Sequence, residues 1–301
     1  MGGLAVLAAF LLLAPPLYFL APFAVLMVLA GPRAPREVLA LLAAVAGLVV
    51  ALSGGTTLGP GLLKASAVAL ALGFGLASLR PRGPVLARAG LALLLAALAI
   101  GVWCWMRGIY WPDVERAFTA MLVETYQAVP GLSRDPATQE ELKRFVGPIL
   151  EAAPGIARAL PGLLALQALA GMGLAALWQH RIARHPAGPP PVPFRQFRFN
   201  DHLIWGAIFT LALWLVPLPP EGRALALNLL VVWAGLYGFR GLAVFAALLA
   251  PAPVLLRVLA AGLAVLLNPI ALGTCVAIGL ADTWFDIRGR FLPPASEGTS
   301  R

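Results

Sequence analysis

A series of long apolar runs is the feature that most limits the fold of this chain. The runs follow one another at 4–30, 38–52, 61–79, 85–106, 156–179, 202–216, 224–249 and 253–280. A helix rises about 1.5 Å per residue, so about 20 apolar residues cross the hydrocarbon core of a bilayer. In lipid, a helix satisfies its backbone hydrogen bonds within itself. The runs therefore predict an all-α polytopic transmembrane helix bundle of about eight to nine spans.

Composition supports a membrane protein and excludes several other classes. Of the 301 residues, 60% are hydrophobic and 12% are charged, and the mean hydropathy is +0.88. Soluble globular domains are about 45–50% apolar and about 25% charged. We therefore exclude an ordinary soluble enzyme, a disordered chain and a coiled coil.

Proline interrupts the first and the last of these runs. Pro15-Pro16 and Pro22 break the first run, which is too short for two crossings and is expected to form one kinked or half-broken span. Asn268-Pro269 splits the last run into either one long broken helix or a tight helical hairpin. A hairpin gives nine spans, whereas a re-entrant first run gives eight.

The distribution of charge predicts the orientation in the membrane. The formal net charge is +9, and basic residues concentrate in one alternate set of the segments between runs. This set contains Arg33, Arg36, Arg80, Arg82, Arg88, Arg181, Arg184, Arg195, Arg198, Arg288, Arg290 and Arg301, whereas the opposite set is nearly balanced. Because basic segments stay in the cytoplasm, we expect a multi-pass protein of a bacterial inner membrane with a cytoplasmic C-terminus.

Four regions are expected along the chain. Residues 1–106 form an N-terminal bundle of four spans, 156–290 a C-terminal transmembrane bundle, and 291–301 a flexible cytoplasmic tail. Residues 107–155 form an extracytoplasmic loop with two short amphipathic outer helices, at 113–129 and 138–152, that lie on the bilayer or cap the bundle. Thr138 and Glu141 are spaced as a capping box at the start of the second helix.

Motifs of soluble catalysis are missing from the sequence. The chain has no phosphate-binding loop, no zinc-protease helix motif and no serine-hydrolase elbow. Cys104 and Cys275 lie inside apolar runs and are expected to be packing residues, without disulfide or metal spacing. We predict that the protein is not an enzyme, that it holds neither cofactor nor metal, and that it does not bind nucleic acid.

A sparse set of polar residues at membrane depth supplies the candidate ligand-binding residues. Polar side chains are costly in lipid, so each one is a functional candidate. Asn228 and Arg240 lie in one run about 18 Å apart along a helix, on similar faces, and are predicted to line one cavity. The alternative is that Arg240 ends a shorter helix and snorkels to the surface. Gln167 and Asn268 complete the set.

Two cytoplasmic segments are expected to act as anchors. Phe194, Phe197 and Phe199 alternate with charged residues in the loop at 185–202, which predicts either an interfacial lipid anchor or a partner-binding segment. The C-terminal segment is predicted to be a cytoplasmic anchor in which Asp282 and Asp286 share a helical face and Asp286 pairs with Arg290. Its residues are Asp282, Trp284, Asp286, Arg288 and Arg290.

Three stretches carry a resemblance to a known family. LADTWFDIRGRF at 280–291, PFRQFRFNDHLIW at 193–205 and NLLVVWAGLYGFRGLAVF at 228–245 resemble the YybS-like family of bacterial predicted membrane proteins of unknown function. That family is similar in architecture to the S components of energy-coupling-factor transporters. The resemblance implies a role in the uptake of small molecules.

Two functions are therefore expected. The first is small-solute binding or uptake, which needs a separate ATPase or transmembrane energising module because the chain has no nucleotide site of its own. The alternative is a non-transporting membrane scaffold for cell-envelope machinery that docks through the outer helices and the Phe-rich loop. In either case the lipid bilayer is a partner.

Overall fold

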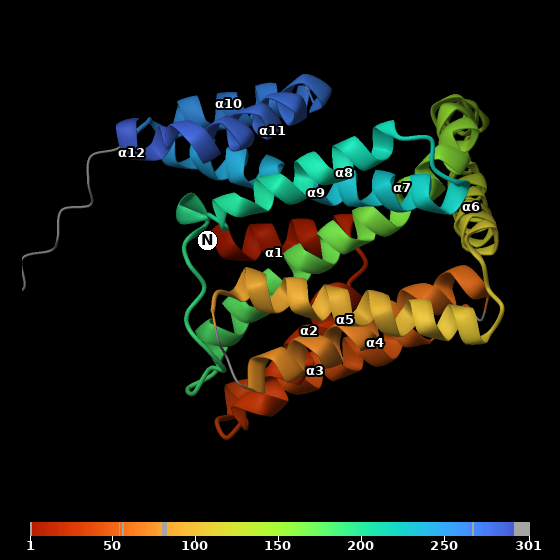
Figure 1. Ribbon diagram of the computed structural model, residues 1–301. Helices are drawn as coiled ribbons and strands as arrows, with labels where there is room; N and C mark the ends of the chain where they lie inside the picture. The colour runs from red at the N-terminus through yellow and green to blue at the C-terminus, as the bar shows by residue number, and fades with distance from the viewer. Residues whose placement is uncertain (1, 54, 56, 80–82, 267, 292–301) are drawn as a thin grey trace, which may run out of the picture. The chain divides into compact units, whose positions relative to one another are not determined.

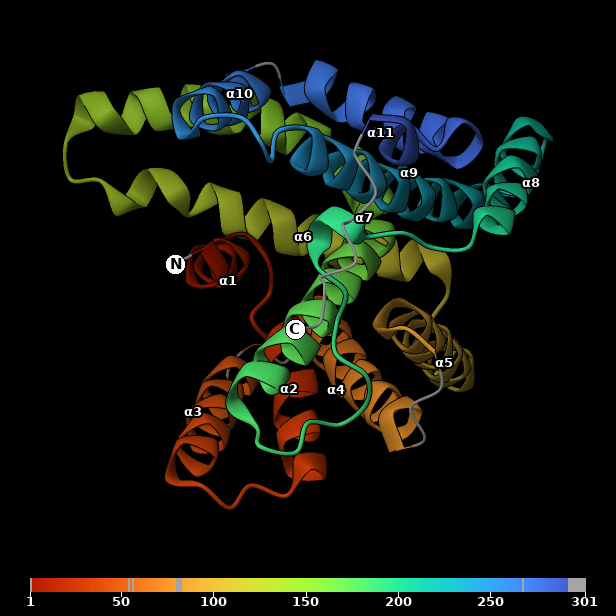
Figure 2. The same cartoon turned by 90° about the vertical axis from the view of Figure 1, so that its left-hand side faces the viewer.

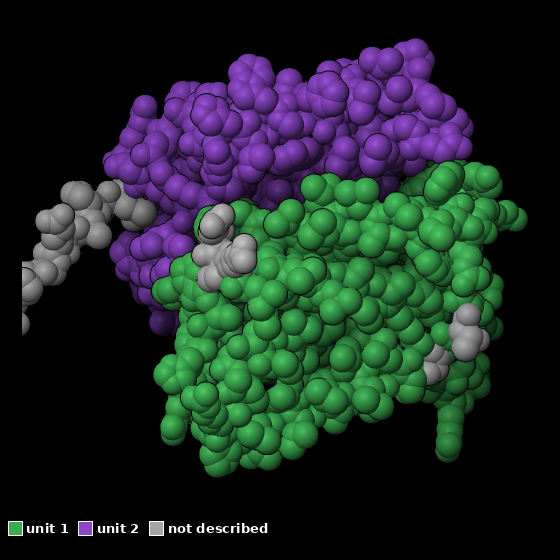
Figure 3. Space-filling view, turned by 60° about the horizontal axis from the view of Figure 1, so that its bottom comes forward, with its two compact units in different colours: residues 1–191 green, residues 192–301 purple. Residues whose placement is uncertain are grey.

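The computed structural model describes residues 2–53, 55, 57–79, 83–266 and 268–291. Across these residues every regular element is a helix, so the predicted all-α fold is confirmed. The chain divides into two compact units, residues 1–191 and residues 192–301, coloured separately in Figure 3.

In unit 1, the short helix α2 is the packing centre (Figure 1). It contacts α3, α4 and α7, and its buried side chains point in all directions around its axis, as expected for a helix enclosed by others. The elements of the unit are α1 (Gly2–Leu13), α2 (Leu17–Ala30), α3 (Pro35–Leu52), α4 (Leu58–Leu79), α5 (Val85–Met106), α6 (Trp111–Gln127), η1 (Val129–Leu132) and α7 (Pro136–Ile182).

In unit 2, the main contact is between α9 and α11. The elements are η2 (Phe194–Gln196), η3 (Asp201–Leu203), α8 (Ile204–Leu215), α9 (Pro220–Leu248), α10 (Val254–Leu266), α11 (Asn268–Phe285) and α12 (Ile287–Phe291). α9 and α11 approach closely because two glycines lie where they cross. Gly279 faces the carbonyl group of Tyr237, and Gly241 faces that of Cys275. Neither position has room for a side chain.

Two of the predicted proline breaks are present, whereas Pro22 lies inside α2 and does not end it. α1 ends at Leu13 and α2 begins at Leu17, on either side of Pro15-Pro16. The last apolar run is divided between α10, which ends at Leu266, and α11, which begins at Asn268. Proline cannot continue the hydrogen-bond ladder of the preceding helix, which explains both breaks.

Five helices of the described chain are long and apolar enough to cross a membrane. They are α3, α4, α5, α7 and α9, and three further apolar helices are shorter, at Leu17–Ala30, Asp201–Leu215 and Ile270–Phe285. These lengths are those of a helical membrane bundle. The number of spans stays a prediction, because the shorter helices need partners or membrane thinning to cross alone.

The loop predicted at 107–155 differs from expectation in one respect. α6 agrees with the first predicted amphipathic helix, but the second is the beginning of α7, which continues without interruption to Ile182. Pro154-Gly155 has the composition of a turn, yet Ala157 packs with Phe118 of α6 in one apolar cluster and keeps the helix continuous. The predicted boundary at 155/156 thus falls inside a helix.

The start of α7 also differs from the predicted capping box. Asp135, not Thr138, is the N-cap residue, and its carboxylate accepts hydrogen bonds from the backbone N–H of Thr138 at 3.1 Å and from its hydroxyl at 2.6 Å. These bonds stabilise the charged form, so the pKa of Asp135 lies below its usual value.

The end of α7 is attached to the beginning of α3 by a buried carboxylate. Glu37 accepts hydrogen bonds from the backbone N–H groups of Arg33 and Ala34, both at 2.8 Å, and from that of Arg184 at 2.7 Å. One turn earlier, Gln179 donates to the carbonyl oxygen of Leu26 at 3.1 Å. The ends of α2 and α7 and the start of α3 are therefore held together.

Candidate functional site

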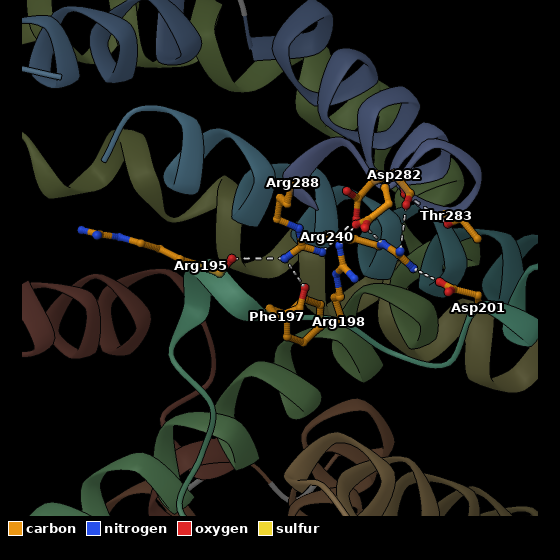
Figure 4. A network of polar contacts seen from close by, with 10 residues as sticks. Arg195, Phe197, Arg198, Asp201, Arg240, Asp282, Thr283 and Arg288 are labelled. Atoms are coloured by element: carbon orange, nitrogen blue, oxygen red, sulfur yellow. Dashed lines mark hydrogen bonds and ion pairs between the residues drawn. The ribbon is translucent and has the colours of Figure 1, made fainter. Parts of the chain in front are cut away.

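Arg240 is the centre of a polar network inside unit 2 (Figure 4). It lies in α9 and is only 1% exposed. Each of its three nitrogen atoms donates a hydrogen bond: Nε to Asp282 Oδ2 at 2.9 Å, Nη2 to the carbonyl oxygen of Asp282 at 3.1 Å, and Nη1 to Asp201 Oδ1 at 2.6 Å. The guanidinium is therefore fully engaged by protein groups.

Asp282 joins a second arginine to this network. Its side chain is fully buried, and Oδ2 also accepts from Arg288 Nη2 at 2.8 Å. Arg288 Nη1 donates to the carbonyl oxygens of Arg195 and Phe197, both at 3.1 Å. The two arginines thus connect α9, α11 and α12 with the loop that precedes α8.

An outer pair completes the cluster. Arg198 forms an ion pair with Asp286, and both side chains are substantially exposed. Asp286 has a φ of +42°, so the backbone turns sharply between α11 and α12. Three arginines and three aspartates therefore balance in charge across the network.

Aromatic side chains shield the buried part of the network from solvent. The Cζ atom of Arg240 lies 5.4 Å from the centre of the Phe199 ring, in cation–π geometry. Phe199 in turn packs edge-on against Tyr237, with ring centres 5.2 Å apart. In such low-polarity surroundings the attraction between two paired charges is strong, and removing one of them leaves the other as an unfavourable buried charge.

The chemistry of this arrangement is that of a structural clamp. An arginine guanidinium stays protonated at physiological pH, so Arg240 and Arg288 hold charge and do not transfer protons. The partners of Arg240 differ in exposure, because the side chain of Asp282 is fully buried whereas that of Asp201 is 62% exposed. Another anion could therefore replace Asp201 at Arg240 more readily than it could replace Asp282.

The four predicted ligand-binding residues lie in different places. Arg240 belongs to the network, and it does not end a shorter helix, because α9 continues beyond it to Leu248. Asn228 is buried nearer the start of α9 and donates to the carbonyl oxygen of Ala224 at 2.8 Å. Gln167 is half-buried in α7 of unit 1. Asn268 begins α11, and its side chain is outside the part that the structure describes.

The residues of the predicted C-terminal anchor divide between the network and the surface. Asp282 and Arg288 are buried, whereas Trp284 is 62% exposed. Asp286 and Asp282 do not share a helical face, because α11 ends at Phe285. The expected pairing of Asp286 with Arg290 is replaced by the ion pair with Arg198.

The sequence interpretation missed the roles of Asp201 and Arg198. Both belong to the Phe-rich loop, which folds onto α9 and α12 instead of extending freely. Each member of the central pair had a signal of its own, because Arg240 lies inside the run at 224–249 and Asp282 follows the run at 253–280 by two residues. No local pattern predicts that Asp201 pairs with Arg240, 39 residues away along the chain, or that Arg198 pairs with Asp286, 88 residues away.

Outside the network, an apolar groove lies on the surface of α5. It is lined by Leu94, Ala97, Leu98, Gly101, Val102 and Trp105. An open apolar groove on a predicted span is typical of a lipid-facing surface. None of the four predicted ligand-binding residues lines it.

Comparison with known proteins places the chain in a family. A family model described as "Predicted membrane protein (DUF2232)" matches residues 4–283. No curated protein and no solved structure matches the chain significantly.

Proposed function

Because this chain belongs to the DUF2232 family of predicted membrane proteins, we propose that it is an integral membrane scaffold without enzymatic activity, which binds a protein partner through a helical arm. Its membrane character, predicted from the apolar runs, agrees with the family and with the long apolar helices. The observation that carries the scaffold proposal is the arm itself, formed by α6, η1 and the first half of α7.

The arm is too long and too charged to be part of a membrane span. α7 has 47 residues and is therefore about 70 Å long, more than twice the thickness of the hydrocarbon core of about 30 Å. Its first half carries Glu140, Glu141, Lys143, Arg144, Glu151 and Arg158. Figure 2 shows this half running beside α6, with the connection between them at the far end.

Contacts at the base make the arm continuous with the bundle of unit 1. Arg158 of α7 forms an ion pair with Glu115 of α6 at 2.7 Å. Phe118 of α6 is buried with Leu62 of α4 and Ala157 of α7 in one apolar cluster. The arm is therefore packed against α4, a predicted membrane span. This attachment is what we expect of a docking element and not of a loose loop.

Two large apolar side chains are exposed on the arm. Leu132, at the tip, is 82% exposed, and Phe145, on α7, is 70% exposed. Aromatic and aliphatic anchors of this kind carry much of the binding energy of protein interfaces. The predicted orientation, with the basic segments and the C-terminus in the cytoplasm of a bacterial cell, puts the arm on the outer side of the inner membrane.

Site-specific photocrosslinking in intact cells tests the scaffold proposal. A photoreactive residue at Leu132 or Phe145 is expected to form an adduct with one partner protein, whereas the same residue at Lys143, about 200° around the helix from Phe145, is expected to form much less. Equal adducts at all three positions, or none above background, contradict the proposal. A partner with a nucleotide-binding module would favour transport instead.

Binding of an anionic solute is the second candidate function. It is favoured by the exposure of Asp201, since a solute carboxylate that displaced Asp201 would reach Arg240 Nη1. In this role the protein needs a separate ATPase or transmembrane energising module and resembles an S component of an energy-coupling-factor transporter. Asn228, Gln167 and Asn268 remain candidates for its ligand-binding residues.

Thermal-shift measurements on Asp201→Asn test this second function. The substitution removes the competing carboxylate, so acetate or succinate is expected to stabilise this variant more than the wild type. Arg198→Gln, which changes the exposed ion pair of the same loop, is the control. No stabilisation of either protein by carboxylates argues against an anion site at Arg240.

A further inference from the structure

Arg88 is a buried cation in unit 1 that has no charged partner among the described residues. It lies in the first turn of α5, is 3% exposed, and donates from Nη1 to Ser78 Oγ at 3.3 Å. Its Cζ atom lies 5.9 Å from the centre of the Phe74 ring. These neighbours are a neutral hydroxyl and an aromatic face, and neither neutralises the positive charge.

Two nitrogen atoms of Arg88 are left without an acceptor. Nε and Nη2 are both inaccessible to solvent and have no hydrogen-bond partner among the described residues. The carboxylate of Glu37 is occupied by the backbone N–H groups of Arg33, Ala34 and Arg184. A buried charge in this state is unfavourable unless an anion from outside the chain completes its contacts.

A glycine of the loop after α7 covers the guanidinium. Gly188 has a φ of +88°, and a Cβ atom there would lie 2.6 Å from Nη1 and 3.1 Å from Nη2 of Arg88. His180 Nε2 lies 3.1 Å from the carbonyl oxygen of Gly188 and holds the loop over the arginine. The cover is thus bare backbone in direct contact with the guanidinium, and this loop must move aside for a ligand to reach Nε and Nη2.

The position of Arg88 in its helix favours an anion. The first N–H groups of a helix have no partner within it, and the helix dipole places a partial positive charge at this end. Exposed arginines gather near the same helix ends, at Arg33, Arg36, Arg181 and Arg184. A span terminus with this charge lies at the level of lipid headgroups.

We propose that Arg88 and Ser78, beneath the backbone of Gly188, form a binding site for a phosphate group, carried by an anionic phospholipid or present as the free ion. The phosphate oxygens accept from Nε and Nη2, the donors that the protein leaves unused. Arginine presents these two donors in a fork that matches a phosphate. The site is separate from the network of unit 2 and does not depend on the scaffold role.

Binding of phosphatidylglycerol to the full-length protein in detergent tests this site. The lipid is expected to raise the melting temperature of the wild type more than phosphatidylcholine does. Arg88→Met removes the charge and keeps an apolar stem, so its apparent affinity for phosphatidylglycerol is expected to fall at least about tenfold. Arg134→Met, at an exposed arginine between η1 and α7, is expected to bind as the wild type does.

A second arm of the experiment distinguishes the source of the phosphate. Sodium phosphate is compared with sodium chloride at equal ionic strength. Stabilisation by phosphatidylglycerol alone assigns the site to a lipid headgroup, and stabilisation by phosphate ion assigns it to the phosphate group itself. No response of the wild type to either ligand, or equal responses of wild type and Arg88→Met, overturns the proposal.

Two further measurements keep the test independent of folding. In lipid-free micelles Arg88→Met is expected to be at least as stable as the wild type, because it removes an uncompensated buried charge. Ser78→Ala leaves all charges in place and is expected to weaken phosphatidylglycerol binding about fivefold through the loss of one hydrogen bond. Unchanged binding in Ser78→Ala together with a destabilised Arg88→Met contradicts the site.

Discussion

Replacing Arg240 by alanine is expected to lower the free energy of unfolding by about 3–5 kcal/mol, the largest effect of any single substitution that we predict. The substitution leaves the fully buried carboxylate of Asp282 with one arginine instead of two, and releases Asp201 from α9. Denaturant titration in detergent, followed by helical circular dichroism, measures the loss. Arg290→Ala, at an exposed position of α12, is expected to change stability little.

The triple substitution Arg240→Met, Asp282→Leu and Arg288→Met separates charge balance from packing, because Asp282 neutralises both buried arginines. Removing all three leaves no buried charge without its partner, so part of the stability lost in Arg240→Ala is expected to return. If Arg240→Ala is as stable as the wild type, the network is not the clamp described here. If the triple variant is no more stable than Arg240→Ala, packing and not charge explains the loss.

Replacing Gly279 by alanine is expected to destabilise unit 2 by at least about 2 kcal/mol. The added methyl group would fall on the backbone carbonyl of Tyr237, and a backbone atom cannot move aside as a flexible side chain can. α9 and α11 must therefore separate, which also disturbs the contact between Arg240 and Asp282. The melting temperature in detergent is the measurement.

Gly273 of α11 is the matched control for this substitution. A Cβ atom there meets nothing within 4 Å, so Gly273→Ala is expected to be neutral or to stabilise the helix by up to about 1 kcal/mol. Equal effects of the two substitutions would show that the helices do not cross at Gly279.

Local patterns predicted those parts of the fold that depend on neighbouring residues. The apolar runs predicted where the helices lie, Pro15-Pro16 predicted the break between α1 and α2, and Asn268-Pro269 predicted that between α10 and α11. An apolar run and a proline influence only the conformation of residues near them in the chain. Helices and their breaks can therefore be predicted from one sequence.

Features that depend on tertiary contacts were not predictable in the same way. Pro154-Gly155 has the composition of a turn, and only the packing of α6 against α7 keeps that helix continuous. Arg240 was identified as important because a charge in a span is costly. Its partners, Asp201 and Asp282, lie 39 and 42 residues away in the sequence, and no periodic pattern links either of them to Arg240.

The most direct test of the membrane architecture is the labelling of single cysteines at the two ends of α7 in intact cells. Cys104 and Cys275 are first replaced by alanine, and one cysteine is introduced at Lys143 or at Arg184. A membrane-impermeant maleimide is expected to label position 143 in intact cells and position 184 only after permeabilisation. Labelling of both positions from outside, or of position 184 alone, would contradict a helix that crosses the membrane with its arm on the outer side.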